Sequence, residues 1–300
     1  MSVRIGINPL TWTNDDLPAL GAETPLSTCL SEGKQAGYSG FELGNKFPRD
    51  AAVLGPILAE YDLKLVSGWY SGKLLEHDLD AEIAAIQDHL NLLKTLGATE
   101  MVYCEVTGCI HGDQEAPLSD RPVINDPAVW ASWGAALTKL AEYTQSQGVR
   151  LAYHHHMGTV VQSEADVDKL MENTDDALGL LLDTGHLTCA GGDPIAVQKR
   201  YANRINHVHC KDVRRVVLDE VNNRGKSFLN GVLDGLFTVP GDGCIDYATL
   251  FKGLKESNYS GWLVVEAEQD PAVANPLKYA TMGYENLRKL CADAGIEVVV

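Results

Sequence analysis

Four short stretches of the chain carry side chains that can bind a divalent metal ion or move a proton. In chain order they read Tyr153-His154-His155-His156, Leu182-Asp183-Thr184-Gly185-His186, His207-Val208-His209-Cys210-Lys211-Asp212 and Val264-Val265-Glu266-Ala267-Glu268. Each stretch ends a short apolar run of the kind that forms a buried parallel strand. Imidazole and carboxylate groups from four strands can converge on one cation and leave a face open for substrate. The pattern therefore indicates a metal enzyme.

Strand geometry predicts which of these side chains share a face, because alternate residues of a strand point to the same side. His154 and His156 are two residues apart, as are Glu266 and Glu268, so each pair should face one way. Asp183 ends an apolar run of three leucines. A polar residue at a strand end can simply be exposed to water. That explanation would have to apply separately to four strands, each of which ends in a possible metal ligand. We therefore expect one shared site.

The elements that must position this site repeat eight times. Apolar runs typical of buried strands occur at about residues 4–11, 40–44, 64–70, 99–106, 149–156, 178–183, 205–210 and 261–267. Helical patterns alternate with them at 26–36, 50–61, 80–96, 127–147, 164–172, 194–203, 247–257 and 277–294. Eight such units favour a closed (β/α)8 TIM barrel over an open doubly wound sheet. No glycine-rich dinucleotide fingerprint and no linker occurs, so residues 1–300 are predicted to form a single barrel domain.

Two predicted connections are too long for simple turns, namely 105–126 after the fourth strand and 213–243 after the seventh. Both lie on the carboxyl side of the barrel, where TIM barrels place their chemistry. The second carries a local basic patch that includes Arg214, Arg224 and Lys226. It is either a solvated loop, a subunit contact or a segment that closes over substrate, in which case Arg214 would contact that substrate.

Composition narrows the class of partner. The formal net charge of -17 disfavours nucleic acid and anionic membrane surfaces, and no apolar run is long enough to span a membrane. Seven cysteines are scattered with no CxxC pair, and no signal segment begins the chain, so we expect a cytoplasmic protein. A neutral small molecule is the expected partner, and a homo-oligomer is possible.

These residues resemble the xylose isomerase-like TIM-barrel superfamily. The Asp-Thr-Gly-His segment at 183–186 is shared across it and does not separate dehydratases from epimerases. Segments 8–12, 154–159, 209–214 and 239–243 narrow the resemblance to the inosose dehydratase family, from Arg4 to about Leu290. The resemblance implies removal of water from 2-keto-myo-inositol, a cyclic polyol ketone, to give a trihydroxycyclohexane-dione in myo-inositol catabolism.

The resemblance also implies a metal site. Asp183, His209 and Glu266 match three ligands of the superfamily, whereas His154 stands where most members have Glu. Either His154 binds through nitrogen or the site has three protein ligands plus water and substrate. Two imidazoles and two carboxylates suit Mn²⁺ or Co²⁺, although Zn²⁺ and Fe²⁺ are also compatible with these ligands.

Acid and base roles follow from the same resemblance. His156 matches a general base of related dehydratases, and histidine suits the role because its unperturbed pKa lies near working pH. Expulsion of hydroxide needs a proton donor, for which His186, a metal-bound water and Lys211 are candidates in that order. Six other residues are candidate substrate contacts, with salt bridging or core packing as the alternative: Asn8, Trp12, Glu42, Glu105, Arg214 and Glu268.

Two other functions remain open. A ketose isomerase or epimerase on the same scaffold would begin with the same proton abstraction, but His154 in place of Glu counts against it. A non-catalytic polyol-binding barrel is the alternative from another class, and a full ligand set beside a base argues against it.

Overall fold

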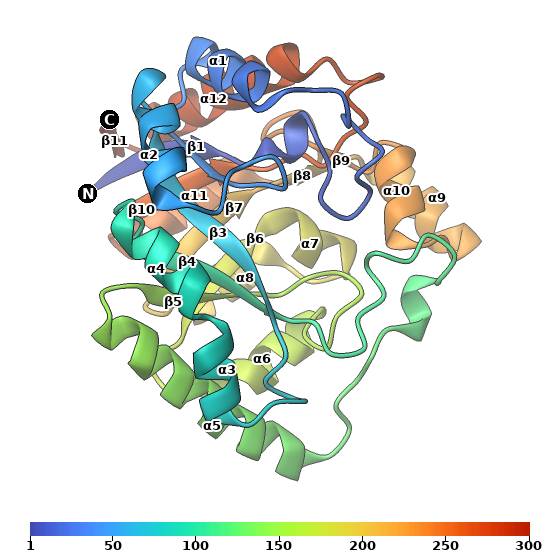
Figure 1. Cartoon of the computed structure of the whole chain (residues 1–300). Helices are drawn as coiled ribbons and strands as arrows, with labels where there is room; N and C mark the ends of the chain where they lie inside the picture. The colour runs from blue at the N-terminus through green and yellow to red at the C-terminus, as the bar shows by residue number, and fades with distance from the viewer.

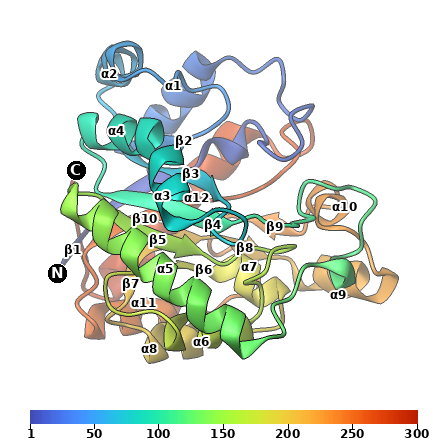
Figure 2. The ribbon, with the colours of Figure 1, turned by 60° about the horizontal axis from the view of Figure 1, so that its bottom comes forward.

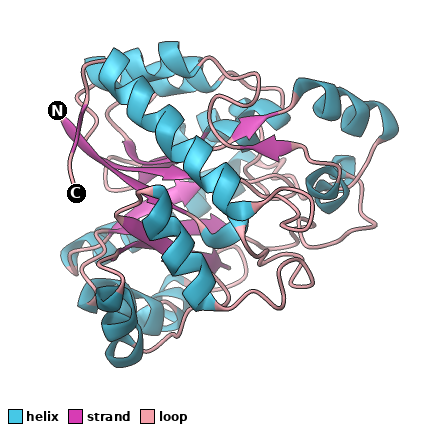
Figure 3. Cartoon of the chain, turned by 90° about the horizontal axis from the view of Figure 1, so that it is seen from above, coloured by secondary structure: helices cyan, strands magenta, loops and turns pink.

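The computed structural model describes residues 1–300 and has at its centre a closed barrel of parallel strands. Its eight strands are β1 (Ser2–Ile7), β2 (Gly40–Leu43), β3 (Lys64–Gly72), β4 (Glu100–Glu105), β5 (Arg150–His154), β6 (Gly179–Asp183), β7 (Ile205–Cys210) and β10 (Gly261–Val265). Consecutive strands pair in this order, and β10 pairs with β1 to close the ring. Figures 1 and 3 show the strands gathered at the centre with helices around them. The predicted (β/α)8 barrel is confirmed.

The helices alternate with the strands as the sequence predicts. They are α1 (Leu26–Ala36), α2 (Ala51–Glu60), α3 (Leu79–Ala85), α4 (Gln87–Thr95), α5 (Pro127–Ser146), α6 (Glu164–Glu172), α7 (Thr184–Cys189), α8 (Pro194–Arg200), α9 (Arg215–Arg224), α10 (Phe228–Leu233), α11 (Tyr247–Glu256) and α12 (Pro276–Asp293). Short 3₁₀ turns lie at Pro9–Thr11 and Leu118–Asp120, and β11 (Glu297–Val298) adds to β1. None of the helices combines the length and the apolar character needed to cross a membrane.

Local capping explains several helix boundaries. The side chains of Ser163, Asp193 and Asp246 accept hydrogen bonds from the first-turn amides of α6, α8 and α11, as their N-cap positions predict. Gly37 follows α1 with a φ of 111°, which a residue with a side chain rarely adopts. One predicted helix, 80–96, is two helices, α3 and α4, which meet at Ile86.

Strands β1, β5 and β10 end earlier than predicted, at Ile7, His154 and Val265. After β1 the chain turns into a 3₁₀ helix whose Asn8 side chain accepts a hydrogen bond from the Leu10 amide. His156 therefore lies just beyond its strand, yet it lines the same cavity as His154. The expectation that both face one way thus holds past the end of the regular strand.

The connection at 213–243 is largely folded, which corrects its prediction as a long loop. It contains α9 and α10, and two short strands, β8 (Asp212–Val213) and β9 (Phe237–Thr238), pair antiparallel at its ends. Figure 2 shows α9 and α10 at the side of the molecule opposite the two termini. A separate apolar cluster that includes Phe228, Val232 and Phe237 stabilises this segment.

The other long connection, 105–126, is irregular except for one 3₁₀ turn, as predicted. Gln114 and Asn230 exchange two hydrogen bonds of 3.1 and 3.0 Å, so this connection contacts α10. The two long connections thus meet on the carboxyl side of the barrel.

Helix α1 packs on strand β2 through Gly33, whose missing side chain makes room for a buried ring. A Cβ at Gly33 would lie 2.2 Å from Cζ of Phe41, which is far inside van der Waals contact. Phe41 is fully buried, and its ring centroid lies 5.7 Å from that of Trp12. The glycine is therefore required by packing rather than by backbone conformation.

We expect Gly33→Ala to lower the urea midpoint of unfolding, although alanine forms helices better than glycine by about 1 kcal/mol. The added methyl group must displace Phe41, and such overpacking typically costs about 1–3 kcal/mol. Gln35→Ala, at an exposed position of the same helix, is the control and should leave the midpoint nearly unchanged. A Gly33→Ala chain as stable as its parent would contradict this account of the contact.

Candidate metal centre and active site

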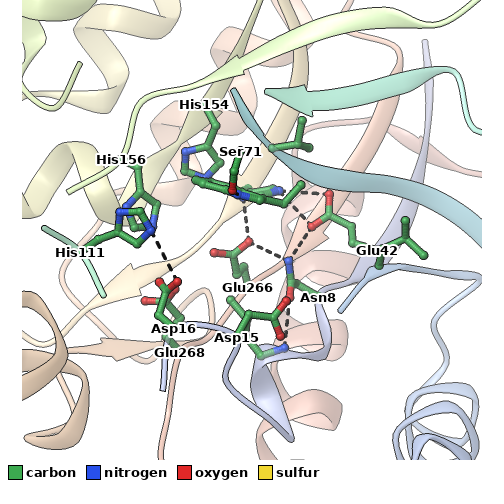
Figure 4. Close-up of a pocket in the computed structure, with 15 residues that line it drawn as sticks. Asn8, Asp15, Asp16, Glu42, Ser71, His111, His154, His156, Glu266 and Glu268 are labelled. Carbon is green, nitrogen blue, oxygen red and sulfur yellow. Dashed lines mark hydrogen bonds and ion pairs between the residues drawn. The ribbon is translucent and has the colours of Figure 1, made fainter. Parts of the chain in front are cut away.

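A cavity opens at the carboxyl ends of the barrel strands, and Figure 4 shows the side chains that point into it. Its polar and aromatic lining comes from strand ends and from the connections that follow them. The residues are Asn8, Asp15, Asp16, Glu42, Trp69, Ser71, His111, His154, His156, His209, Glu266 and Glu268, with Leu10, Leu43 and Val102 between them. No lysine or arginine is among them.

His154 is oriented to offer a free nitrogen. Its Nδ1 donates a 2.7 Å hydrogen bond to the carbonyl of His155, so Nε2 carries no proton in the neutral ring. That Nε2 lies 3.6 Å from Oδ2 of Asp183, a separation that suits two ligands of one ion better than a direct bond. Burial, and next the charge of His209, hold the pKa of His154 well below its usual range. His154 is thus a neutral imidazole with a nitrogen free to bind a metal ion.

The other three predicted ligands converge on the same point. Nδ1 of His209 lies 3.5 Å from Oδ2 of Asp183 and 2.8 Å from Oε2 of Glu266. Neither Asp183 Oδ2 nor His209 Nδ1 has a hydrogen-bond partner, although both are buried. One ligand atom from each of the four residues, His154 included, lies within 4.8 Å of the other three.

The charges of this group favour a cation. Burial opposes a charge on His209, but Glu266 and Glu42 outweigh it and raise the pKa of this imidazole well above its usual range. Carboxylates that hold a proton on His209 so strongly would favour a divalent ion in its place. Buried, unpartnered nitrogen and oxygen atoms at this spacing therefore fit a divalent metal ion.

Glu42 orients the metal group, and its own oxygens are already bonded. It accepts hydrogen bonds from Nε2 of His207 at 2.8 Å and Nε2 of His209 at 3.1 Å. It also accepts from Ser67 Oγ at 2.5 Å and from Asn8 Nδ2 at 2.8 Å, so four groups donate to this carboxylate. Because Nε2 of His209 is engaged by Glu42, Nδ1 is the nitrogen left for the metal. Glu42 lines the cavity as expected, but these bonds suit it to a positioning role rather than to the predicted substrate contact.

We expect Glu42→Gln to weaken metal binding by about 10–100-fold, the usual cost of losing a group that orients a ligand. A glutamine keeps one acceptor oxygen but loses the negative charge beside the two imidazoles, and it places an NH2 group where Asn8 now donates to Oε2. Equilibrium dialysis with Mn²⁺ would measure the change, and thermal unfolding of the metal-free proteins would show whether the fold is retained. Unchanged Mn²⁺ affinity would contradict the positioning role.

His156 is held in the tautomer that a general base requires. Its Nδ1 donates a 2.8 Å hydrogen bond to the carbonyl of Met157, which leaves Nε2 as an acceptor in a ring that lines the cavity. Burial, and then the charge of His111, hold the pKa of His156 well below its usual range. The ring is therefore neutral with Nε2 free to accept a proton, and the same burial makes it a weaker base than an exposed imidazole.

His186 and Lys211, predicted as acid or base candidates, lie behind the cavity wall. The His186 ring packs against His156 at a tilt of 44°, with centroids 3.9 Å apart, and its Nε2 accepts a 2.9 Å hydrogen bond from Nζ of Lys211. Lys211 is fully buried, 2.6 Å from Oε1 of Glu266 and 3.5 Å from Oε1 of Glu268. Neither lines the cavity, so both support it from behind. The family resemblance and the reaction chemistry suggested their roles, but neither reveals how deep a side chain lies.

The predicted substrate contacts divide into two groups. Asn8 and Glu268 line the cavity, and burial raises the pKa of Glu268 to about 8 although Lys211 opposes this. Asn8 donates to Glu266 Oε2 at 3.1 Å as well as to Glu42, so it bridges two carboxylates.

Trp12, Glu105 and Arg214 do not line the cavity. Trp12 is buried against Phe41 and donates to Glu32, because its ring belongs to the core. Glu105 accepts from the amides of Leu75 and Thr107 at 3.1 Å each and so fastens two connections. Arg214 donates to the carbonyls of Gly235 and Phe237 and to Asp242, which ties the ends of the folded insertion together.

Five polar or aromatic lining residues were not predicted as site residues: Asp15, Asp16, Trp69, Ser71 and His111. Asp15 and Asp16 follow the 3₁₀ turn after β1, and His111 comes from the irregular connection after β4, so no strand period marks them. Trp69 and Ser71 share one face of β3, and that alternation was the available signal.

Comparison with known proteins identifies the family. A family model described as xylose isomerase-like TIM barrel matches residues 30–290. The chain belongs to this family. A zinc-bound IOLI protein has the same fold, with a TM-score of 0.66 over 98% of each chain at 18% identity.

Relatives of higher identity extend over nearly the whole chain. The rhizopine catabolism protein MocC of Rhizobium meliloti is 51% identical, covering 99% of this chain and 91% of that protein. An inosose dehydratase of Clostridium perfringens is 45% identical, covering 93% of this chain and 94% of its own length. The family resemblance predicted from sequence segments is confirmed.

Proposed function

We propose that the protein is an inosose dehydratase, a hydro-lyase that removes water from 2-keto-myo-inositol to give a trihydroxycyclohexane-dione in myo-inositol catabolism. The observation that carries the proposal is His156, a neutral imidazole whose free Nε2 lines the cavity beside the four-residue metal group. The 45% identity with the Clostridium perfringens inosose dehydratase supports it.

The reaction begins at the carbon next to the ketone. Nε2 of His156 takes the α-proton, and the Nδ1 bond to Met157 holds the ring while it becomes charged. Such a proton is a weak acid, so the enolate charge must be stabilised as it develops. The hydroxyl one carbon further on then leaves with a proton, and the enol tautomerises to the diketone.

The proposed cofactor is a divalent cation held by His154, Asp183, His209 and Glu266. When bound, it supplies a Lewis acid for the ketone oxygen. Two nitrogen and two oxygen ligands suit Mn²⁺ or Co²⁺. The IOLI protein of the same fold binds zinc, so Zn²⁺ belongs in any comparison of metals.

Incubation of metal-reconstituted protein with 2-keto-myo-inositol tests the proposal. We expect an ultraviolet absorbance from the diketone, dependent on added metal, and a product lighter by one water. A product of unchanged mass would point to the isomerase or epimerase alternative. Binding without any turnover would point to the polyol-binding alternative.

The greater identity to MocC favours a second candidate, a role of the same site in rhizopine catabolism. Parallel assays with rhizopine and with 2-keto-myo-inositol as substrates would decide between them. A higher kcat/KM for rhizopine would favour the second candidate.

Location and assembly complete the proposal. The net charge of -17 supports a neutral small-molecule partner rather than nucleic acid or an anionic membrane. We place the protein in the cytoplasm and allow for a homo-oligomer, which light scattering would measure.

A further inference from the structure

One imidazole in the cavity is used neither by the metal group nor as the base. His111, from the connection after β4, faces His156 with ring centroids 5.1 Å apart. Its Nε2 lies 3.5 Å from Oδ1 of Asp16, and both side chains line the cavity. Figure 4 shows His111 beside His156 and directed toward Asp16. This position next to the base suits a role in the same reaction.

The backbone fixes the separation of the two rings. The amide of Ile110 donates a 2.9 Å hydrogen bond to the carbonyl of Gly158, in the turn that follows His156. Gly158 has a φ of 78°, and a Cβ there would lie 2.9 Å from the backbone nitrogen of His111. The Trp69 ring lies beside both imidazoles, with its centroid 6.2 Å from that of His111 and 5.4 Å from that of His156. His111 is therefore held against the base.

The gap between His111 and Asp16 matches a hydroxyl group. A direct N–H···O bond would measure about 2.7–3.2 Å, so Nε2 and Oδ1 are slightly too far apart to satisfy each other. A hydroxyl oxygen can accept from Nε2 while its proton is donated to Oδ1. Nδ1 of His111 is buried without a partner, so Nε2, which faces Asp16, is the nitrogen through which this ring can donate into the cavity. His156 offers an acceptor nitrogen to the cavity and His111 offers a donor.

We propose that the His111–Asp16 pair is the general acid of the elimination, binding the departing hydroxyl between Nε2 and Oδ1 and supplying the proton with which it leaves as water. This inference rests on the proposed function. The carbon–oxygen bond breaks with its electrons on oxygen, which takes the proton. The electrons of the former α-carbon–hydrogen bond form the carbon–carbon double bond. Before the step the pair holds one extra proton, as the His111 imidazolium beside the Asp16 carboxylate. Nε2 gives that proton to the departing oxygen, which leaves neutral His111 with its proton on Nδ1 and the Asp16 carboxylate. His156 then releases its proton to solvent, from which His111 is reprotonated.

The substrate geometry agrees with an acid beside the base. In an inosose whose neighbouring hydroxyls are trans, the hydrogen on one carbon and the hydroxyl on the next lie on the same face of the ring. His156 and His111 stand side by side, so a single ring face can meet both. His186 and Lys211 do not line the cavity, which leaves the carboxyl groups of Glu268 and Asp15 as competing donors. Each offers oxygen alone, whereas the pair matches both ends of a hydroxyl.

The test separates proton abstraction from loss of water. In His111→Gln and Asp16→Asn, loaded with Mn²⁺, we expect elimination to slow by about 10²–10⁴-fold. Exchange of the substrate α-proton with deuterated solvent should continue at a rate close to wild type, because His156 and the metal group are untouched. A substrate analogue with fluorine at the departing position should lose much less rate, because fluoride leaves without a proton. Metal content and thermal unfolding would show that both variants are loaded and folded.

Three results would overturn the assignment. The first is elimination at the wild-type rate in both His111→Gln and Asp16→Asn. The second is slow elimination in Glu268→Gln alone, which would make Glu268 the general acid. Equal loss of exchange and elimination would show that His111 and Asp16 only hold the cavity in shape. If the wild-type protein neither exchanges nor eliminates, the proposed function itself fails, which distinguishes that failure from failure of the acid assignment.

Discussion

Asp183→Asn should lose its bound metal and nearly all activity while keeping its fold. Oδ2 of Asp183 is a buried oxygen without a hydrogen-bond partner, and an amide nitrogen there would bring protons toward His154 and His209. Oδ1, which caps α7 by accepting from the His186 amide at 2.8 Å, is retained in asparagine. Loss of several kcal/mol of charge stabilisation corresponds to a rate lower by about 10³-fold or more.

Elemental analysis and turnover measure this prediction directly. Glu266→Gln should behave in the same way, and Asp176→Asn, whose side chain is fully exposed, is the matched control that should keep both metal and activity. Full metal occupancy in Asp183→Asn and Glu266→Gln would remove the proposed site. His154→Glu, which restores the ligand commoner in the superfamily, should retain metal and turn over more slowly.

The barrel and the convergence of the four proposed metal ligands were predictable because their signals are periodic. Asp183, His209 and Glu266 follow apolar strands, and strand ends of a parallel barrel meet at one level. Their convergence within 4.8 Å therefore follows from the same regularity that gives the fold. The single-domain prediction for residues 1–300 remains a prediction, which one cooperative unfolding transition would support.

The sequence did not reveal how deep each side chain lies in the barrel or where the irregular connections run. Lys211 and His186 share strand ends with the ligands, but close packing behind His156 places them outside the cavity, and spacing alone carries no depth. Trp12 follows β1 as predicted, yet its ring enters the core, because the 3₁₀ turn redirects the chain. Conversely, His111 reaches the site because the amide of its neighbour Ile110 donates to the carbonyl of Gly158, in a distant part of the sequence.

We expect His156→Ala to keep its metal content near wild type while α-proton exchange falls by about 10²–10⁴-fold. His156 supplies no atom to the metal group, whose ligand on this segment is His154. Nε2 of His156 is the free imidazole nitrogen of the tautomer that accepts a proton, and its removal leaves the ketone bound without a base. Exchange into deuterated solvent, followed by mass spectrometry, isolates this step from the later loss of water.

A matched variant separates the base from the packing around it. The His156 ring packs on His186 and Phe228, so alanine also leaves a void, whereas His156→Asn retains an amide that can donate to the Met157 carbonyl. Both variants should lose exchange, because neither offers a basic nitrogen. Loss of exchange in His156→Ala but not in His156→Asn would attribute the effect to packing. Exchange at the wild-type rate in both variants would show that another group is the base. Since His111 presents a donor nitrogen where His156 presents an acceptor, it should not substitute as the base, and the two steps of the reaction should fail separately in the two sets of variants.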